Sequence, residues 1–387
     1  GREGRGFEYA DGVLTHHGTF QRYFGQAELC DYVAGVLGRD PVTVGPGMVF
    51  IFRADEEEQA FLARRQRSVP RPADGLAPET RPREPKGRAR PAPYERHQEV
   101  LDAFWGVALE LGRLPELGEF ERWDDIAEAF GNARRAFAAL PFPERDAELA
   151  RAAARRSEDL LVYLALNLFE RRRSAQTLPA SIQRDIRCFF GSHKAAAERA
   201  RSALFESGSA EHTAAAAARA ATEGLGVLAA KDGDYTFHAS LLQQQPAPLR
   251  ILLGCAERLE PIPSGVDLLK VHGSGRRVSY LRFDDFAGRP LPVLAWRLLV
   301  DLRRQRTEEV PVGGPEGRRV LLGKARLMPP DAPGRDRQER FDEVLRRGGV
   351  LLQEGLGPGT RALARRLAAA GIIGRDRASG GPETDRC

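Results

Sequence analysis

A group of polar residues between positions 235 and 282 could bind an anion or move protons. The candidates are Tyr235, His238, Lys270, His272, Arg277, Ser279, Tyr280 and Arg282. An ammonium group beside a hydroxyl can hold a phosphate oxygen, and a nearby imidazole can carry a proton. No Ser-His-Asp order and no metal-ligand spacing is evident in the sequence, so catalytic residues stay unassigned and no metal site is expected. The alternative is an exposed sheet face, which is polar by default.

Two strands must position the central members of this group. The runs 266–272 and 277–283 read as strands, and Gly273-Ser274-Gly275 between them is a hairpin signal. Side chains alternate across a strand, so Lys270 and His272 share one face, and the register decides whether Ser279 or Tyr280 joins them. These four residues and Arg277 are the primary candidates for an anion site, with Tyr235 and His238 secondary. In the alternative interpretation, Tyr280 packs inward and Lys270 is only solvated.

The segment 111–137 has the layout of a small helix-turn-helix. It begins with Gly112-Arg113-Leu114-Pro115, and Phe130-Gly131 precede a basic helix. It resembles endonuclease-associated helix-turn-helix repeats, in which an F-G-S-x-x-x-A helix faces DNA. Arg134 and Arg135 would then contact phosphates. The alternative is a helical hairpin whose arginines are solvated.

A second feature, the glycine run 355–359 before a helix, has the shape of a nucleotide-binding loop. Two facts oppose that interpretation: the position for an acidic residue holds Gln353, and fewer than 30 residues follow Gly359. We therefore expect a helix N-terminal turn there and no cofactor.

Charge is concentrated in one segment. The chain has 387 residues and a net charge of +5, while nine basic residues face three acidic ones between Arg64 and Arg90. This Pro-rich stretch could hold nucleic-acid phosphates non-specifically or serve as a solvated tether.

Other global features limit the class of protein. No apolar run is long enough to span a membrane, so no membrane partner is expected. Four scattered cysteines without a CxxC pair argue against a zinc ribbon or a disulfide framework, which favours a cytoplasmic location. The start of the sequence, GREGRGFEYADG, is charged and does not resemble a signal peptide.

Composition and periodicity suggest five segments. A small α/β piece (1–66) should contain a helix over 19–38 and strands over 41–45 and 47–53. A basic Pro-rich linker (67–93), a helical region (94–230), an α+β region (231–374) and a disordered tail (375–387) should follow. The run LAWRLLVDLRR at 294–304 could be strand or helix, and no repeat of fixed period is evident.

Three blocks carry a family resemblance, in the order 11–29, 178–196 and 234–286. They resemble DNA phosphorothioation-associated methyltransferases, and the Q-R-D-I-R-x-F-F-G-S and K-x-H…V-S-Y-L blocks are the most specific. The resemblance implies a mixed α/β fold: the C-terminal remnant of a Rossmann-like methyltransferase domain, then a mainly helical region and an α+β region. It implies a bacterial protein that uses S-adenosylmethionine when intact. It also implies DNA, and proteins of the DNA sulfur-modification system, as partners.

Against the family pattern, the glycine loop and the acidic ribose-binding position are absent, so we expect no cofactor residue in this chain. The family's Asn-Pro-Pro…Leu-His-Arg-Lys-Glu stretch appears only as 318–325, and the arginine after the K-x-H histidine is Gly273. The expected function is that of a fragment of an S-adenosylmethionine-dependent methyltransferase that supplies DNA- or partner-binding regions. The alternatives are a non-enzymatic DNA-binding adaptor and a nuclease-like activity around residues 235–272. The anion held at Lys270 would be a DNA phosphate or phosphorothioate.

Overall fold

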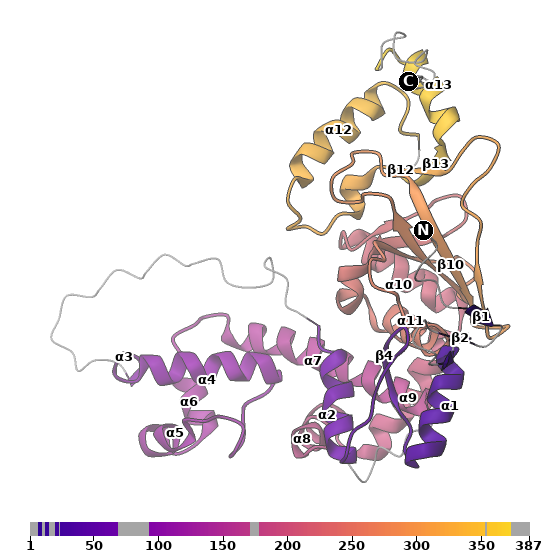
Figure 1. The fold of residues 1–387 in the computed structure, drawn as a ribbon. Helices are drawn as coiled ribbons and strands as arrows, with labels where there is room; N and C mark the ends of the chain where they lie inside the picture. The colour runs from indigo at the N-terminus through magenta and orange to yellow at the C-terminus, as the bar shows by residue number, and fades with distance from the viewer. Residues whose placement is uncertain are drawn as a thin grey trace, which may run out of the picture. The chain divides into compact units, whose positions relative to one another are not determined.

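The structure is a computed structural model that describes residues 7–9, 12–14, 20–22, 24–68, 93–170, 178–352 and 354–372 (Figure 1). The chain forms two compact units, one made of residues 1–53 and 207–387 and the other of residues 54–206. Most of the expected linker and all of the expected tail lie outside the described residues. The described cysteines Cys30, Cys188 and Cys255 are free thiols.

The first unit is built on a six-stranded antiparallel sheet in the order β11-β10-β9-β8-β7-β6. Its strands are β6 (Val227–Leu228), β7 (Tyr235–His238), β8 (Leu268–Val271), β9 (Arg277–Phe283), β10 (Leu294–Asp301) and β11 (Arg306–Glu309). The predicted hairpin is confirmed as β8 and β9. The undecided run at 294–304 provides strand β10, because its apolar side chains pair across β9 in the middle of the sheet.

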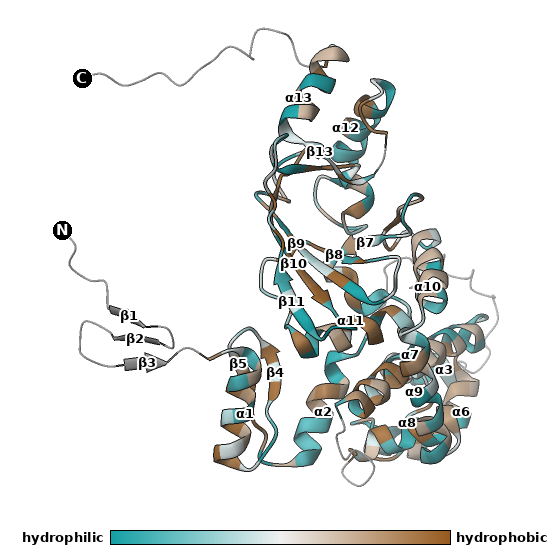
Figure 2. Cartoon of the chain, turned by 90° about the vertical axis from the view of Figure 1, so that its right-hand side faces the viewer, coloured by the Kyte–Doolittle hydropathy of each residue, from teal (hydrophilic) through white to brown (hydrophobic). Residues whose placement is uncertain are grey.

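One face of this sheet is covered by helices. Helices α10 (Ala210–Thr222) and α11 (Ala247–Leu259) pack on it, and the short 3-10 helix η2 (Ala239–Gln244) precedes α11 (Figure 2). The strands contribute to this core the buried side chains of Tyr235, Phe237, Leu269, Val271, Val278, Tyr280 and Val300. These residues fall on alternate positions of their strands, as one sheet face requires.

The opposite face of the sheet is only partly covered. Apolar side chains at one end, including Leu268, Leu281 and Phe283, pack against Leu321, Leu327 and Met328. The covering elements are β12 (Arg319–Leu322) and the 3-10 helix η3 (Lys324–Leu327). A third core joins β12 to β13 (Gly355–Gly359), α12 (Arg335–Arg347) and α13 (Thr360–Ala369). The other end of this face carries polar side chains.

The segment 1–66 corrects part of the expected fold. Strands β1 (Phe7–Tyr9), β2 (Gly12–Leu14) and β3 (Phe20–Arg22) form an antiparallel sheet, and helix α1 (Gln26–Leu37) starts only after β3. The expected hairpin is present as β4 (Val42–Gly45) and β5 (Met48–Phe50). Tight turns between strands force antiparallel pairing, whereas a Rossmann-like sheet needs crossovers of a dozen or more residues. The described residues therefore show a mixed α/β chain with antiparallel sheets, and they do not confirm a Rossmann-like remnant.

The second unit is helical, as the sequence predicts for most of it. Its helices are α2 (Asp55–Arg65), α3 (Pro93–Arg96), α4 (Gln98–Leu111), α5 (Trp123–Phe130), α6 (Ala133–Ala139), α7 (Arg145–Phe169), α8 (Ala180–Phe190) and α9 (His193–Ser207). Helices α4, α5 and α6 share a core around Phe104 and Ile126, both fully buried. The helix-turn-helix expected in 111–137 corresponds to α5 and α6.

The pair α8 and α9 repeats the design of α5 and α6. Both pairs turn at a glycine with positive φ, 82° at Gly131 and 76° at Gly191. In each, the next side chain caps the second helix: Asn132 Oδ1 accepts from the Arg135 N–H (3.0 Å), and Ser192 Oγ accepts from the Ala195 N–H (3.1 Å). The same helical hairpin therefore occurs twice in this unit.

A buried ionic network connects the two hairpins. Asp185 on α8 accepts from Arg113 Nε (2.8 Å) and from Arg156 Nη2 on α7 (2.6 Å), and its side chain is 0% exposed. Arg113 also holds Glu119 through two bonds of 2.7 Å. Arg184 Nη1 also lies 3.1 Å from Glu119 Oε1, so three guanidinium groups share two almost fully buried carboxylates, and each charge depends on its partners.

We therefore expect Asp185→Asn to lower the free energy of unfolding by about 3 kcal/mol, because Arg156 would keep a buried charge without a counterion. Urea denaturation of the full chain measures this. The matched control is Glu128→Gln, at an exposed position of α5, which should change stability by less than about 0.5 kcal/mol. A loss no larger than that of the control would contradict the assigned role of the network.

Candidate functional site

The polar half of the sheet face opposite α11 gathers most of the candidate residues. In the register, Lys270 on β8 stands opposite Ser279 on β9 and opposite Thr236 on β7. Ser279 is thus the hydroxyl that shares a face with Lys270. Tyr280 points the other way, is fully buried in the core, and donates its hydroxyl to the Glu260 carbonyl (3.0 Å).

The two secondary candidates have structural roles. Tyr235 is fully buried on the core face and donates to Gln245 Oε1 (3.0 Å). His238 accepts the Ser240 N–H on its Nδ1 (3.2 Å), and its ring lies 5.3 Å from that of Phe286. Burial lowers the pKa of His238. Neither residue lines the pocket described below.

A chain of hydrogen bonds runs along the polar face. Arg297 on β10 donates through Nε to Ser279 Oγ (3.3 Å), and that oxygen lies 2.9 Å from His272 Nε2. A guanidinium can only donate, so Ser279 Oγ accepts from Arg297; whether it donates to His272 Nε2 or accepts from it depends on the imidazole tautomer. The other ring nitrogen, Nδ1, lies 3.5 Å from Asp234 Oδ2.

The neutral state of His272 has a clear electrostatic cause. Its pKa is lowered to about 4, and burial is the largest cause; the nearby Asp234 raises the pKa, whereas the charges of Lys270, Arg297 and Arg277 lower it. The imidazole thus takes a proton only in acid.

Asp234 is held by a cation and by backbone. Its carboxylate forms an ion pair with Lys270 and accepts the Gly273 N–H (2.9 Å). Burial alone would raise the pKa of Asp234, but the bonds from Lys270 and Gly273 bring it below its ordinary value. A Cβ at Gly273 would lie 2.2 Å from the Asp232 carbonyl oxygen. The chain therefore needs glycine at position 273.

The fold brings the Asp234 carboxylate, the His272 imidazole and the Ser279 hydroxyl into a row, as in a serine hydrolase. Ser279 is 0% exposed, however, and its oxygen already accepts from Arg297. A nucleophile must reach its substrate, so this row is suited to orienting Arg297 and Lys270 rather than to attacking a bond.

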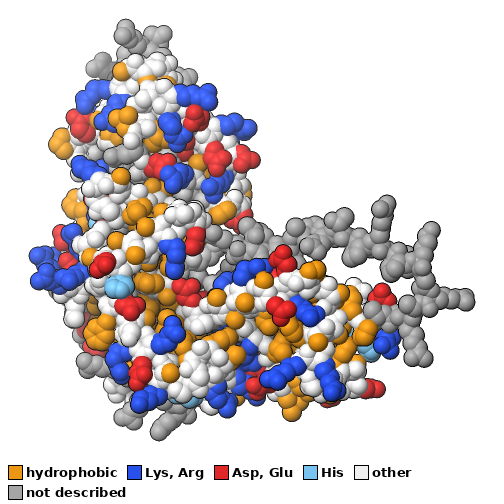
Figure 3. All heavy atoms as spheres, turned by 180° about the vertical axis from the view of Figure 1, so that it is seen from behind, with side chains coloured by type: hydrophobic (Ala, Val, Ile, Leu, Met, Phe, Trp, Pro, Cys, Tyr) orange, Lys and Arg blue, Asp and Glu red, His pale blue; other side chains and the backbone are white. Residues whose placement is uncertain are grey.

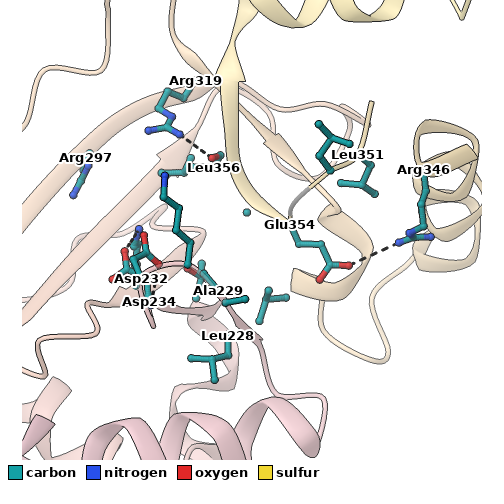
Figure 4. Close-up of a pocket in the computed structure, with 17 residues that line it drawn as sticks. Leu228, Ala229, Asp232, Asp234, Arg297, Arg319, Arg346, Leu351, Glu354 and Leu356 are labelled. Carbon is teal, nitrogen blue, oxygen red and sulfur yellow. Dashed lines mark hydrogen bonds and ion pairs between the residues drawn. The ribbon is translucent and has the colours of Figure 1, made fainter. Parts of the chain in front are cut away.

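Both cations open into a pocket of about 650 Å³ (Figure 4). Arg297, Arg319 and Asp234 lie on one side of it, and Glu354 with Arg346 on the other. The polar lining also includes Lys231, Asp232, Thr236 and Lys270, and the apolar lining consists of Val227, Leu228, Ala229, Ala230, Leu351, Leu352 and Leu356. A volume of this size is typical of small-molecule sites.

Most charges of the pocket have partners within the chain. Arg319 donates to the carbonyls of Leu356 and Gly357 (both 2.9 Å), and Glu354 pairs with Arg326 (2.5 Å) and Arg346 (3.8 Å). Arg297 differs, because within the described ranges no carboxylate lies at ion-pair distance from it. Half-burial lowers the pKa of Arg297, and the positive charges of Arg319 and Arg277 lower it as well. A guanidinium nonetheless stays charged, so among the described residues Arg297 is a cation without an ion-pair partner, although the more distant Asp234 carboxylate raises its pKa.

The other candidates lie outside the pocket. Arg277 is exposed at the start of β9. Arg134 and Arg135 belong to the helical unit, where both are exposed at the start of α6.

The glycine run is a strand rather than a loop. Gly355–Gly359 forms β13 and pairs with β12. A Cβ at Gly357 would lie 2.6 Å from the Leu322 side chain, and one at Gly359 would lie 2.3 Å from the Glu316 carbonyl oxygen. Close packing explains these two glycines without a phosphate, and Gln353 lies outside the described residues.

Sequence reasoning missed Asp234, Arg297 and Arg319. Asp234 directly precedes strand β7, and its place beside Lys270 follows from the pairing of β7 with β8. Arg297 lies in the run whose strand or helix character periodicity left open. Arg319 lies in the stretch 318–325, where no local motif indicates a binding role.

Comparison with known proteins gives no match: no family model, no curated protein and no solved structure is significantly similar to the chain. No group of three or more His, Cys, Asp or Glu side chains that could hold a metal occurs among the described residues. In the same ranges, no helix has the length and apolar character needed to cross a membrane.

The state of His272 predicts a pH dependence of stability. Between pH 6.5 and about 4 the unfolded chain takes up a proton at this position and the folded chain does not, so stability rises with pH across this window. Stability should therefore be complete above pH 6.5 and should fall, by up to about 3 kcal/mol, as the pH drops to 4.

Urea denaturation at pH 7 and pH 4.5 tests this with His272→Gln. The variant should lose less stability on acidification than the unchanged chain. The control His212→Gln, at an exposed position of α10, should lose as much stability on acidification as the unchanged chain. Equal losses in all three proteins would show that His272 is not held neutral.

Proposed function

We propose that the protein binds nucleic acid and that the pocket beside Arg297 takes a backbone phosphate or phosphorothioate. The observation that carries the proposal is Arg297 itself, a half-buried guanidinium with no carboxylate at ion-pair distance in the described part of the chain. Desolvating a cation costs free energy that an anion can offset. A guanidinium also fits phosphate oxygens in a bidentate manner.

The surrounding geometry supports an anion rather than a neutral ligand. Nε of Arg297 is engaged by Ser279, which leaves the two terminal nitrogens for a ligand. Lys270 stands on β8, which is separated from β10 by β9, and it lines the same pocket. Its carboxylate partner Asp234 also accepts the Gly273 N–H, which disperses part of the negative charge.

The family resemblance supplies the biological setting of the proposal. It points to a bacterial DNA sulfur-modification system, in which the intact protein would be an S-adenosylmethionine-dependent methyltransferase. The residues described here would contribute DNA or partner binding, with Arg134 and Arg135 of the α5–α6 hairpin as a further contact. The alternative is a non-enzymatic DNA-binding adaptor of the same system, and the pocket serves either role.

The test is Arg297→Gln, measured by fluorescence anisotropy with single-stranded and duplex DNA from 50 to 200 mM salt. Loss of one phosphate contact should weaken binding about tenfold and reduce the slope of log affinity against log salt by about one contact. Arg337→Gln removes one charge from an exposed position on α12 and should have little effect.

Circular dichroism of each variant would verify that it is folded. Unchanged affinity and slope in folded Arg297→Gln would overturn the proposal. So would an equal loss in Arg337→Gln, because that result would reflect net charge alone.

A further inference from the structure

A cluster of exposed arginines lies at one end of the six-stranded sheet, beyond the pocket. Its members are Arg276 and Arg277 at the start of β9, and Arg303, Arg304 and Arg306 at the β10–β11 turn. Strand pairing brings them together: Asp301 is opposite both Arg277 and Arg306, and the Leu302 N–H donates to the Arg276 carbonyl (3.0 Å). We call these five residues the arginine tip.

The tip has little compensating negative charge. Arg306 pairs with Glu308 (3.3 Å), but over the described residues no carboxylate is at ion-pair distance from the other four. The Asp301 carboxylate accepts the backbone N–H of Arg304 (3.0 Å). In the space-filling view, Lys and Arg side chains gather at the left edge, the side on which the β10–β11 turn lies (Figure 3).

The turn holds a defined shape. Gln305 has a φ of 51°, in the left-handed region that residues other than glycine seldom adopt. This conformation reverses the chain between Arg304 and Arg306, so the arginines stand on a formed turn.

Strand β10 connects the tip to the pocket on one face of the sheet. Arg297 and Asp301 lie four residues apart on that strand, which corresponds to about 13 Å. The charge of Arg277 already lowers the pKa of Arg297, so the two regions interact electrostatically. In a double helix each strand carries a charge about every 3.4 Å along the axis, so the separation matches roughly four nucleotides of one stacked strand.

We propose that the arginine tip binds the backbone of the same nucleic-acid strand whose phosphate enters the pocket, about four nucleotides away. This inference rests on the proposed function. A membrane surface fits less well, because interfacial binding needs exposed apolar side chains beside the cations, and Leu302, the apolar residue of the β10–β11 turn, is half-buried against the core.

The test compares Arg303→Gln/Arg304→Gln with the control Arg337→Gln/Arg340→Gln, which removes two charges from exposed positions of α12. The probes are a thymidine dinucleotide with a 5′ phosphate and a thymidine octanucleotide. The tip variant should lose about tenfold or more in affinity for the octanucleotide at low salt, and the salt slope should fall by about 1.4 for two contacts. Its affinity for the dinucleotide should stay unchanged, because two nucleotides cannot span the distance.

The outcomes separate this inference from the proposed function. If Arg297→Gln weakens both probes and the tip variant weakens neither, the tip is not a contact but the pocket is. The proposal for the tip would also be overturned if the tip variant lost affinity equally for both probes. It would likewise be overturned if the tip variant lost binding to phosphatidylserine vesicles while its binding to the octanucleotide stayed intact. If Arg297→Gln changes neither probe, the proposed function itself fails.

Discussion

The polar end of the sheet depends on the carboxylate of Asp234. It lies where β7 begins and meets three donors that arrive from elsewhere: the Lys270 ammonium, the Gly273 N–H and, more distantly, the His272 imidazole. Without this carboxylate, Lys270 would lose its ion-pair partner, and Lys270, Arg297 and the half-buried His272 would remain together in a region of low dielectric constant. The hydrogen bonds that orient Ser279 and Arg297 follow from that arrangement.

The two faces of the same strands show how one pattern serves two purposes. Side chains at 269, 271, 278 and 280 fill the core under α11, while those at 270, 277, 279 and 297 face the partly covered side. Burial on the core face contributes the stability, at roughly 25 cal/mol per Å² of apolar surface. The strands are therefore rigid enough to hold cations at fixed spacing, which is what recognition of a charged backbone requires.

The helices of the helical unit are held together differently: a helical hairpin occurs twice, and buried ion pairs stabilise the arrangement. Arg113 comes from the loop that precedes the first hairpin and Asp185 from the first helix of the second. Gly112 makes this approach possible, because its Cβ would lie 2.8 Å from the Ala152 carbonyl oxygen. The ion pairs fix one arrangement of the helices and offset the cost of their own burial only when every partner is in place.

Local sequence determined the elements, and tertiary pairing decided the site. The glycine turn and flanking apolar residues were enough to predict the β8–β9 hairpin, because hairpin formation depends on neighbours in the chain. The shared face of Lys270 and His272 followed from strand periodicity alone.

Periodicity could not choose between Ser279 and Tyr280, since a shift of one residue exchanges the two faces. Nor could it bring Asp234 and Arg297 to Lys270, because they lie on other strands, 36 and 27 residues away in sequence. The sequence also did not predict that α8–α9 repeats α5–α6. F-G-N occurs in the α5–α6 hairpin and F-G-S in the α8–α9 hairpin, but no fixed period relates the flanking residues. Only folding brings together charges that the sequence separates, and the strand order and register decide which of them meet.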